Sequence, residues 1–435
     1  MQLRRLTLTQ FRAFEQAEFE FQPGMNLLVG VNGVGKSTVL DALRILLSQI
    51  LPKFTSSKDT VRNFGIDDIK IERKELKAEL DFTLFIESSS PLFGAAESIV
   101  SFKYSVSQPR EKYVENKKRV GTVREQTISQ FATKELRPNE RTISKFSKER
   151  INQSIAVYFS TRRSLPSTAQ GSKTKSMGYQ AFAFADALAP GRALRIREFA
   201  DWWLTRQVLS NQSGETQYLE YLDVLQETVE SFMSNCRNLR AVSEPETTLL
   251  LEKNGTTLDV RQLSDGERGM LALVLDLGRR LALANTGSDD PLRDGKAVVL
   301  IDELDLHLHP RWQRDIVRKL TETFPNCQFI ATTHSPQIVG EVAPEKIILL
   351  EEGKPPYPPN QSLGMDTNWI LKRLMGTDER EAKTQKDLAK IARLIENEKY
   401  DQATKAIDKL RARLGEFPEL VRLRTRIDRI QFLGK

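Results

Sequence analysis

Cysteine and long apolar runs are scarce in this sequence of 435 residues. Its two cysteines, Cys236 and Cys327, are far apart and match no metal or disulfide framework, which favours a reducing compartment. No run of about 18 apolar residues is present, and the opening MQLRRLTLTQF is interrupted by charge. We therefore expect a cytoplasmic protein with no signal peptide and no membrane-spanning segment.

Histidine is also scarce, with three residues in the chain: His307, His309 and His334. The first two have the HxH spacing that some metal sites use. Because His334 is the only other histidine, we expect packing rather than metal binding at this pair. Sustained heptads are missing as well, which excludes long coiled-coil arms.

The remaining composition is that of a globular protein. With 39% hydrophobic residues, the chain can bury a large core in two or three structural units. The formal net charge is +7, a mild excess that fits nucleic-acid contact without requiring it.

Apolar periodicity divides the chain into four predicted parts with an α/β pattern. Residues 1–52 hold strands and a helix over 37–51 that Pro52 ends. Residues 53–245 form an inserted strand and helical region, in which a strand near 155–160 returns to the core sheet. Residues 246–350 alternate strands with helices. A linker rich in proline and glycine over 351–364 precedes a helical unit over 365–435.

The stretch from Gly30 to Ser37 matches the phosphate-binding pattern G-x-x-x-x-G-K-[ST], between a buried strand and a helix. Backbone N–H groups and the helix N-terminus can hold the β- and γ-phosphates, and Lys36 adds a charge. The Ser37 hydroxyl suits Mg²⁺. A glycine turn without a ligand is the alternative, which this context disfavours. The predicted cofactor-binding residues here are Gly30, Asn32, Gly33, Gly35, Lys36, Ser37 and Thr38.

Two carboxylates follow the buried strand predicted over 297–301. At the carboxyl end of a parallel strand, Asp302 is placed to hold Mg²⁺ and Glu303 to orient or deprotonate a water. His334 follows the next strand, where it can reach a γ-phosphate. An acidic loop and a surface histidine are the alternatives for each motif taken alone.

Ser264 and Glu267 have the spacing of a capping box ahead of a long amphipathic helix. Their role can be purely structural. A capped N-terminus next to Gly266 is also an anion site, suited to the γ-phosphate of a nucleotide held by another subunit. The two roles are compatible.

Taken in order, these four elements resemble the ABC class of ATPases. The opening LRRLTLTQFRAFEQAEFEF and the wide insertion before the LSDGE signature look like its RecF, SMC and OLD group. The resemblance implies an ABC-type ATPase head in which two subunits sandwich two ATP molecules with Mg²⁺. In that arrangement Lys36, Glu303 and His334 are catalytic and face the signature of the other chain, and Asp305 lies at the dimer seam.

Three positions are open within this resemblance. Asp265 stands where transporter cassettes usually have glycine, which argues against a transporter. Gln153 is a candidate for the glutamine loop, for which the sequence offers no firm residue. Arg12 can approach the nucleotide, as in SMC relatives, or be a surface arginine.

A narrower likeness concerns IAVYFSTRRSL, DELDLHLHPRWQR and the charged tail. Together these look like the PtuA-type ATPase subunits of Septu and retron-linked antiphage systems. The likeness implies a separate HNH-type nuclease partner, and the chain itself carries no nuclease motif. Two alternatives are a nucleotide-bound scaffold that holds a nuclease without turnover, and a DNA repair ATPase like RecF.

Three further regions bear on partners. Residues 109–150 carry ten or more Lys and Arg with acids between them, which fits either a solvated face or a DNA-facing surface. Trp202 and Trp203 are expected in the core. The tail resembles one tetratricopeptide-like hairpin, whose apolar face we expect to dock on a partner or on the ATPase core. That face comprises Tyr400, Ala403, Ile407, Leu410 and Leu414.

Overall fold

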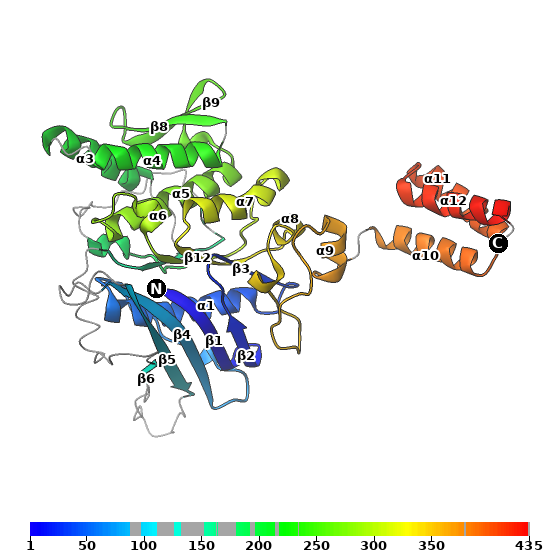
Figure 1. The fold of residues 1–435 in the computed structure, drawn as a ribbon, viewed down its shortest axis with the longest axis horizontal. Coiled ribbons are helices and arrows are strands. Elements are labelled where there is room, and N and C mark those ends of the chain that lie inside the picture. Colours follow the sequence, from blue (N-terminus) through cyan, green and yellow to red (C-terminus); the bar gives the residue numbers. More distant parts are fainter. Residues whose placement is uncertain are drawn as a thin grey trace. The chain divides into compact units, whose positions relative to one another are not determined.

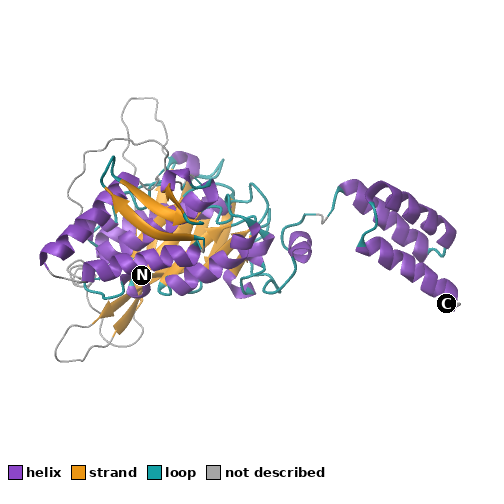
Figure 2. Ribbon diagram, turned by 90° about the horizontal axis from the view of Figure 1, so that it is seen from above, coloured by secondary structure: helices purple, strands orange, loops and turns teal. Residues whose placement is uncertain are grey.

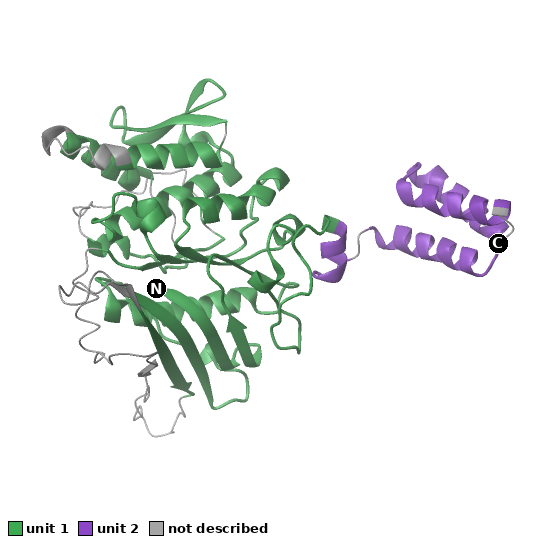
Figure 3. Cartoon of the chain, in the orientation of Figure 1, with its two compact units in different colours: residues 1–367 green, residues 368–435 purple. Residues whose placement is uncertain are grey.

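The computed structural model describes residues 1–87, 97–110, 126–131, 152–161, 163, 180–191, 196–213, 217–233, 235–377 and 380–433. Most of the basic segment 109–150 lies outside these residues. The chain divides into two compact units, Met1–Thr367 and Asn368–Lys435 (Figure 3). The predicted fold class, an α/β head followed by a small helical unit, is confirmed.

The first sheet is antiparallel, in the order β2-β1-β4-β5-β6. Its strands are β1 (Gln2–Phe11), β2 (Phe14–Glu20), β4 (Glu75–Glu87), β5 (Glu97–Pro109) and β6 (Gln126–Phe131). Apolar residues alternate along β1, and buried Leu6 stands opposite Phe19 on one side and Leu80 on the other. Strands β4 and β5, which the sequence assigned to the inserted region, therefore extend the sheet that begins at residue 2.

The second sheet is parallel and carries the functional residues. Its order is β13-β3-β12-β11-β7, from β3 (Met25–Val29), β7 (Ile155–Phe159), β11 (Ala297–Ile301), β12 (Cys327–Thr332) and β13 (Ile347–Leu349). All residues of these five strands are buried, as expected for a sheet covered on both faces. The predicted return to the core sheet near 155–160 is confirmed. Because the strands are parallel, their carboxyl ends meet at one edge.

Helices separate and cover the sheets (Figure 1). Helix α1 (Lys36–Phe54) lies between the antiparallel and parallel sheets, and α5 (Asp265–Ala284) and α7 (Pro310–Thr323) cover the other face of the parallel sheet. Beyond them lie α3 (Ile196–Ser213) and α4 (Gln217–Phe232), next to a three-stranded sheet of β8 (Cys236–Val242), β9 (Thr248–Lys253) and β10 (Thr256–Asp259). Figure 2 shows the same layers from above, with helices in purple and strands in orange. Trp202 and Trp203 are each 2% exposed, which confirms their place in the core.

Two predicted boundaries are wrong. Helix α1 continues past Pro52 to Phe54, because proline in the last turn sacrifices one backbone hydrogen bond while Phe54 becomes buried. Residues 351–364 are not a free linker. Tyr357 pairs with Leu349 at the end of β13, and buried Ser362 donates a hydrogen bond to Val342 O over 2.6 Å.

The C-terminal unit begins within the short helix α9 (Thr367–Arg373) and has its own core. Helices α10 (Ala382–Glu396), α11 (Tyr400–Leu414) and α12 (Pro418–Leu433) pack together. The expectation that the hairpin leaves its apolar face for docking is wrong, because α10 supplies a third helix that covers it. The buried residues of this core are Ile391, Ile395, Ala403, Ile407, Leu410, Leu420 and Ile427.

This packing predicts different outcomes for two leucines on α11. Leu410 is 3% exposed and Leu414 is 49% exposed. We expect Leu410→Ala to lower the free energy of unfolding of the C-terminal unit by about 2–5 kcal/mol, because it leaves a cavity. Hydrogen exchange of the full chain checks this, with Leu414→Ala as the matched control. Equal loss of protection in both variants would contradict the three-helix core.

Candidate functional site

The phosphate-binding loop lies at the carboxyl edge of the parallel sheet, between β3 and α1. Val31, Asn32 and Gly33 are exposed along it, and Thr38 is partly buried on α1. Gly35 has φ +103° as the residue before α1, and a Cβ there would stand 2.7 Å from the ring of Phe14. Because residues 31–33 are exposed, the backbone at the tip of the loop is accessible to a phosphate group.

Lys36 reaches back over the loop. Its ammonium donates hydrogen bonds to Gly30 O over 2.8 Å and to Val31 O over 2.9 Å. Burial lowers the pKa of Lys36, and the charges of three nearby carboxylates oppose that shift. These belong to Asp302, Glu303 and Asp305, so the lysine lies within electrostatic reach of the acidic strand end.

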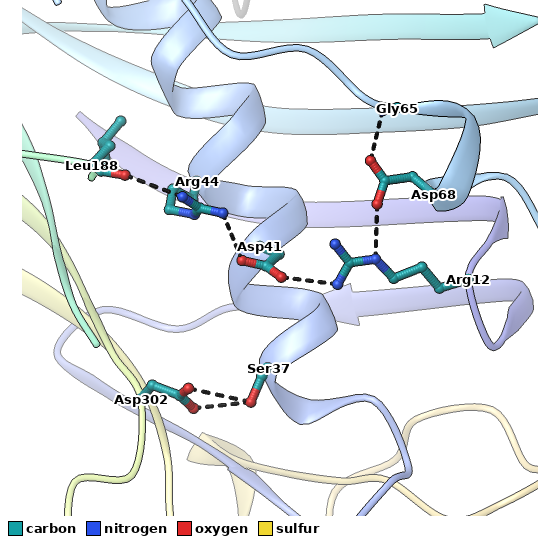
Figure 4. Close-up of polar contacts among 8 residues, drawn as sticks. All are labelled: Arg12, Ser37, Asp41, Arg44, Gly65, Asp68, Leu188 and Asp302. Atoms are coloured by element: carbon teal, nitrogen blue, oxygen red, sulfur yellow. Dashed lines mark hydrogen bonds and ion pairs between the residues drawn. The ribbon is translucent and has the colours of Figure 1, made fainter. Parts of the chain in front are cut away.

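Ser37 and Asp302 meet across the site (Figure 4). The Ser37 hydroxyl lies 3.1 Å and 3.3 Å from the two carboxylate oxygens of Asp302. Thr332, at the end of β12, donates to Asp302 Oδ1 over 2.8 Å and thereby fixes the carboxylate. A hydroxyl and a carboxylate are the hard oxygen ligands that Mg²⁺ prefers. Among the described residues, no group of three His, Cys, Asp or Glu side chains could hold a metal ion.

Glu303 has an unusual backbone, with φ +50° in the left-handed region. Its N–H donates to Thr332 Oγ1 over 2.7 Å, and the next N–H, that of Leu304, donates to Thr332 O over 2.8 Å. The conformation is therefore held by the neighbouring strand. Such strain at a strand end is typical of functional sites.

Asp305 is the last residue of the acidic segment, residues 302–305, and connects it to the turn that carries His334. Its Oδ1 accepts hydrogen bonds from Thr333 Oγ1 over 2.6 Å and from His334 N over 3.0 Å. The structure thus brings Lys36, Ser37, Asp302, Glu303 and the His334 turn to one edge. The place of Asp305 at a dimer seam stays a prediction.

The predicted capping box is present at the start of α5. Ser264 is the N-cap, and its N–H and hydroxyl donate to Glu267 Oε2 over 3.1 Å and 2.8 Å. Burial opposes ionisation of Glu267, but Lys253 at 2.7 Å and Ser264 outweigh it and hold the pKa of Glu267 below its ordinary value. The structural role is confirmed, and the contact with a nucleotide of another subunit stays a prediction.

Gly266 packs against the loop that follows the acidic segment of the same chain. A Cβ at this position would stand 2.3 Å from His307 O. Glycine here lets the first turn of α5 approach the loop that follows Glu303. The start of α5 and the loop that holds His307 are therefore in close backbone contact.

One candidate nucleotide contact, Gln153, is wrong, and the other, Arg12, stays untested. Gln153 lies before the amino end of β7, at the edge of the sheet opposite the phosphate loop, and its amide bonds to Ser56 N and Ser56 Oγ over 2.8 Å each. Arg12 is engaged with Asp68 and Asp41 at 2.9 Å each (Figure 4). Its side chain is partly exposed, and its approach to a nucleotide stays a prediction.

The histidine pair has structural roles in the described chain. His309 caps α7, where its Nδ1 accepts a hydrogen bond from Arg311 N over 3.3 Å. His307 supplies the carbonyl that faces Gly266. Sequence reasoning missed another residue, Arg163, whose guanidinium donates to the backbone carbonyls of Asp302 and Glu303. The paired arginines after the buried strand at 155–159 were the available signal.

Residues 25–340, which include the phosphate loop, the acidic segment and His334, match the family described as "AAA domain, putative AbiEii toxin, Type IV TA system". The chain belongs to this AAA family. Among the described residues of this AAA protein, no helix is long and apolar enough to span a membrane.

Curated relatives of this AAA protein include ATPases of retrons and a Septu protein. The chain is 41% identical to the "Retron Ec83 probable ATPase" of Escherichia coli, over 45% of the chain and only 36% of that relative. It is 25% identical to the "Retron Vc95 probable ATPase" of Vibrio cholerae, over 81% of the chain and 74% of the relative. It is 22% identical to the Septu protein PtuA of Bacillus thuringiensis, over 87% and 85%.

Solved structures similar to this AAA chain include an SMC head bound to the C-terminal winged-helix domain of ScpA. The TM-score is 0.44, with 14% identity over 83% of the chain and 98% of that structure. A RecF structure matches with a TM-score of 0.40 and 16% identity, over 82% and 97%.

The close approach at Gly266 predicts that Gly266→Ala destabilises the protein, although alanine is the better helix former by about 1 kcal/mol. The methyl group would collide with a backbone carbonyl that cannot move freely. Gly269, on the same helix, is the matched control, since a Cβ there meets Arg163 O at an ordinary 3.5 Å. We expect a lower midpoint of thermal unfolding for Gly266→Ala alone. Equal midpoints would contradict the packing described here.

Proposed function

We propose that the chain is an ATP hydrolase of the ABC type that uses ATP-dependent dimerisation to regulate a nuclease in antiphage defence. The observation that supports ATP hydrolysis is the hydrogen bond between Ser37 and Asp302, together with Lys36, which lies within electrostatic reach of Asp302 and Glu303. Family membership and relatives named as probable ATPases support it.

Each residue has a defined task in this proposal. Lys36 leaves the carbonyls of Gly30 and Val31 and binds the β- and γ-phosphates, for which its charge is suited. Ser37 and Asp302 hold Mg²⁺, which neutralises charge developing on the phosphates. Glu303 orients the attacking water and accepts its proton, and His334 contacts the γ-phosphate.

The dimer is proposed on the position of the signature turn. Ser264, Gly266 and Glu267 begin α5, and the helix N-terminus favours an anion. In the proposed assembly this turn meets the γ-phosphate bound to the other subunit, with Asp305 at the seam. ATP then joins the subunits, and hydrolysis releases them.

The biological role is proposed from the relatives. The retron and Septu names support an antiphage defence system, and the PtuA likeness supports a separate HNH-type nuclease as the partner. The helical unit over 365–435 and the surface of residues 53–245 are the proposed sites for that partner or for DNA. A cytoplasmic location is part of the same proposal.

Glu303→Gln and Lys36→Ala test this function. We expect Glu303→Gln to retain ATP binding, lose phosphate release and accumulate a larger ATP-dependent assembly, because the sandwich forms but does not open. Lys36→Ala loses both binding and assembly. Light scattering with Mg-ATP, run beside a phosphate assay, measures both, and Glu322→Gln on the exposed face of α7 is the control.

Other outcomes favour the alternatives. A fixed large mass with negligible turnover in the wild type and in Glu303→Gln identifies a nucleotide-bound scaffold. Tight, salt-sensitive DNA binding by the chain alone favours a repair ATPase like RecF.

A further inference from the structure

Arg163 lies directly behind the acidic segment of the site. It follows β7, the neighbour of β11 in the parallel sheet, and its two terminal nitrogens donate to Asp302 O and Glu303 O. One of these nitrogens also lies 3.4 Å from Ser160 O. A single guanidinium thus spans the peptide groups of both acidic residues.

Arg163 is charged, and its hydrogen bonds fix the position of its guanidinium. Burial lowers the pKa of Arg163 to about 10, against the opposing charges of Asp305, Asp302 and Glu303, so the side chain is still protonated at neutral pH. The planar fork of arginine fits two carbonyl acceptors, and such charge-assisted hydrogen bonds are stronger than neutral ones.

Glu303 needs such support because its backbone is in the left-handed region, with φ +50°. A residue other than glycine is strained in this region and keeps the conformation only where its surroundings hold it. Thr332 holds the N–H groups of Glu303 and Leu304, and Arg163 holds the carbonyl between them. Both peptide groups that set the direction of the Glu303 side chain are therefore fixed.

Arg163 also contacts the signature helix. Its backbone carbonyl faces Gly269 on α5, and Arg163 lines an open recess together with Asp265, Met270 and His307. Arg163 therefore lies between the start of α5 and the acidic strand end.

We propose that Arg163 is a positioning residue for ATP hydrolysis, which holds Glu303 in its left-handed conformation so that the carboxylate meets the attacking water. The inference rests on the proposed function, since it assigns a task to Glu303 in that reaction. It assigns no contact between Arg163 and the nucleotide.

Arg163→Met tests the inference, because it keeps the length of the side chain and removes both donors. We expect kcat for ATP to fall by about 100-fold, the size of effect that a small misplacement of a catalytic group produces. The Kd for Mg-ATP stays within about twofold, since the phosphate contacts are untouched. Arg163→Lys keeps the charge but not the fork, and recovers part of the lost kcat. Arg314→Met, at an exposed position on α7, is the matched control.

Hydrogen exchange in the full chain supplies a readout that does not depend on turnover. Arg163→Met speeds exchange of the Leu304 amide relative to the control, with protection elsewhere unchanged. Wild-type kcat in Arg163→Met, or a joint loss of kcat, Mg-ATP affinity and protection throughout the chain, overturns the inference. If the wild type itself lacks turnover, the proposed function fails, and unchanged Leu304 protection in Arg163→Met then overturns the positioning role as well.

Discussion

The hydrogen bonds between Ser37 and Asp302 join two parts of the chain that are 265 residues apart in sequence. They form because β3 and β11 lie in one parallel sheet, with β12 between them, so that their carboxyl ends reach the same edge. Ligands of open α/β sheets bind at this edge. The rest of the proposed chemistry depends on this meeting.

A second layer of contacts fixes the groups that would act there. Thr332 forms hydrogen bonds with both Asp302 and Glu303, and Asp305 accepts a hydrogen bond from the backbone N–H of His334. Gly266 brings the signature turn against the carbonyl of His307. The acidic segment is consequently joined to β12 and to the His334 turn by hydrogen bonds, and the carbonyl of His307, just after it, packs against the start of α5.

Sequence reasoning performed well where local pattern determines structure. The apolar run before Gly30, the helix after it and the Ser264 capping box are all local features, and the structure confirms them. Gln153 was misjudged because its distance from the site depends on strand direction, which one sequence does not display. Arg163 was missed because its acceptors are backbone carbonyls, which leave no trace in residue identity.

The C-terminal unit shows that contacts between helices are also hard to predict from the sequence. Spacing along α11 located Ala403, Ile407 and Leu410 on the apolar face correctly, but Leu414 is exposed. It did not show what covers the face, because α10 contributes that cover through Ile391 and Ile395. The helical unit is thus self-sufficient in its core. A partner that binds it would use the outer surface of these helices.

We propose that Ser37 and Asp302 together hold the Mg²⁺ of a bound nucleotide. Calorimetric titration of ATP with Mg²⁺ and with EDTA, on the wild type, Ser37→Ala and Asp302→Asn, tests it most directly. We expect Mg²⁺ to strengthen ATP binding to the wild type. We expect both substitutions to remove this gain in affinity and to leave the affinity for ATP in EDTA similar to that of the wild type. Wild-type Mg²⁺ dependence in both variants, or no ATP binding by the wild type, would contradict it.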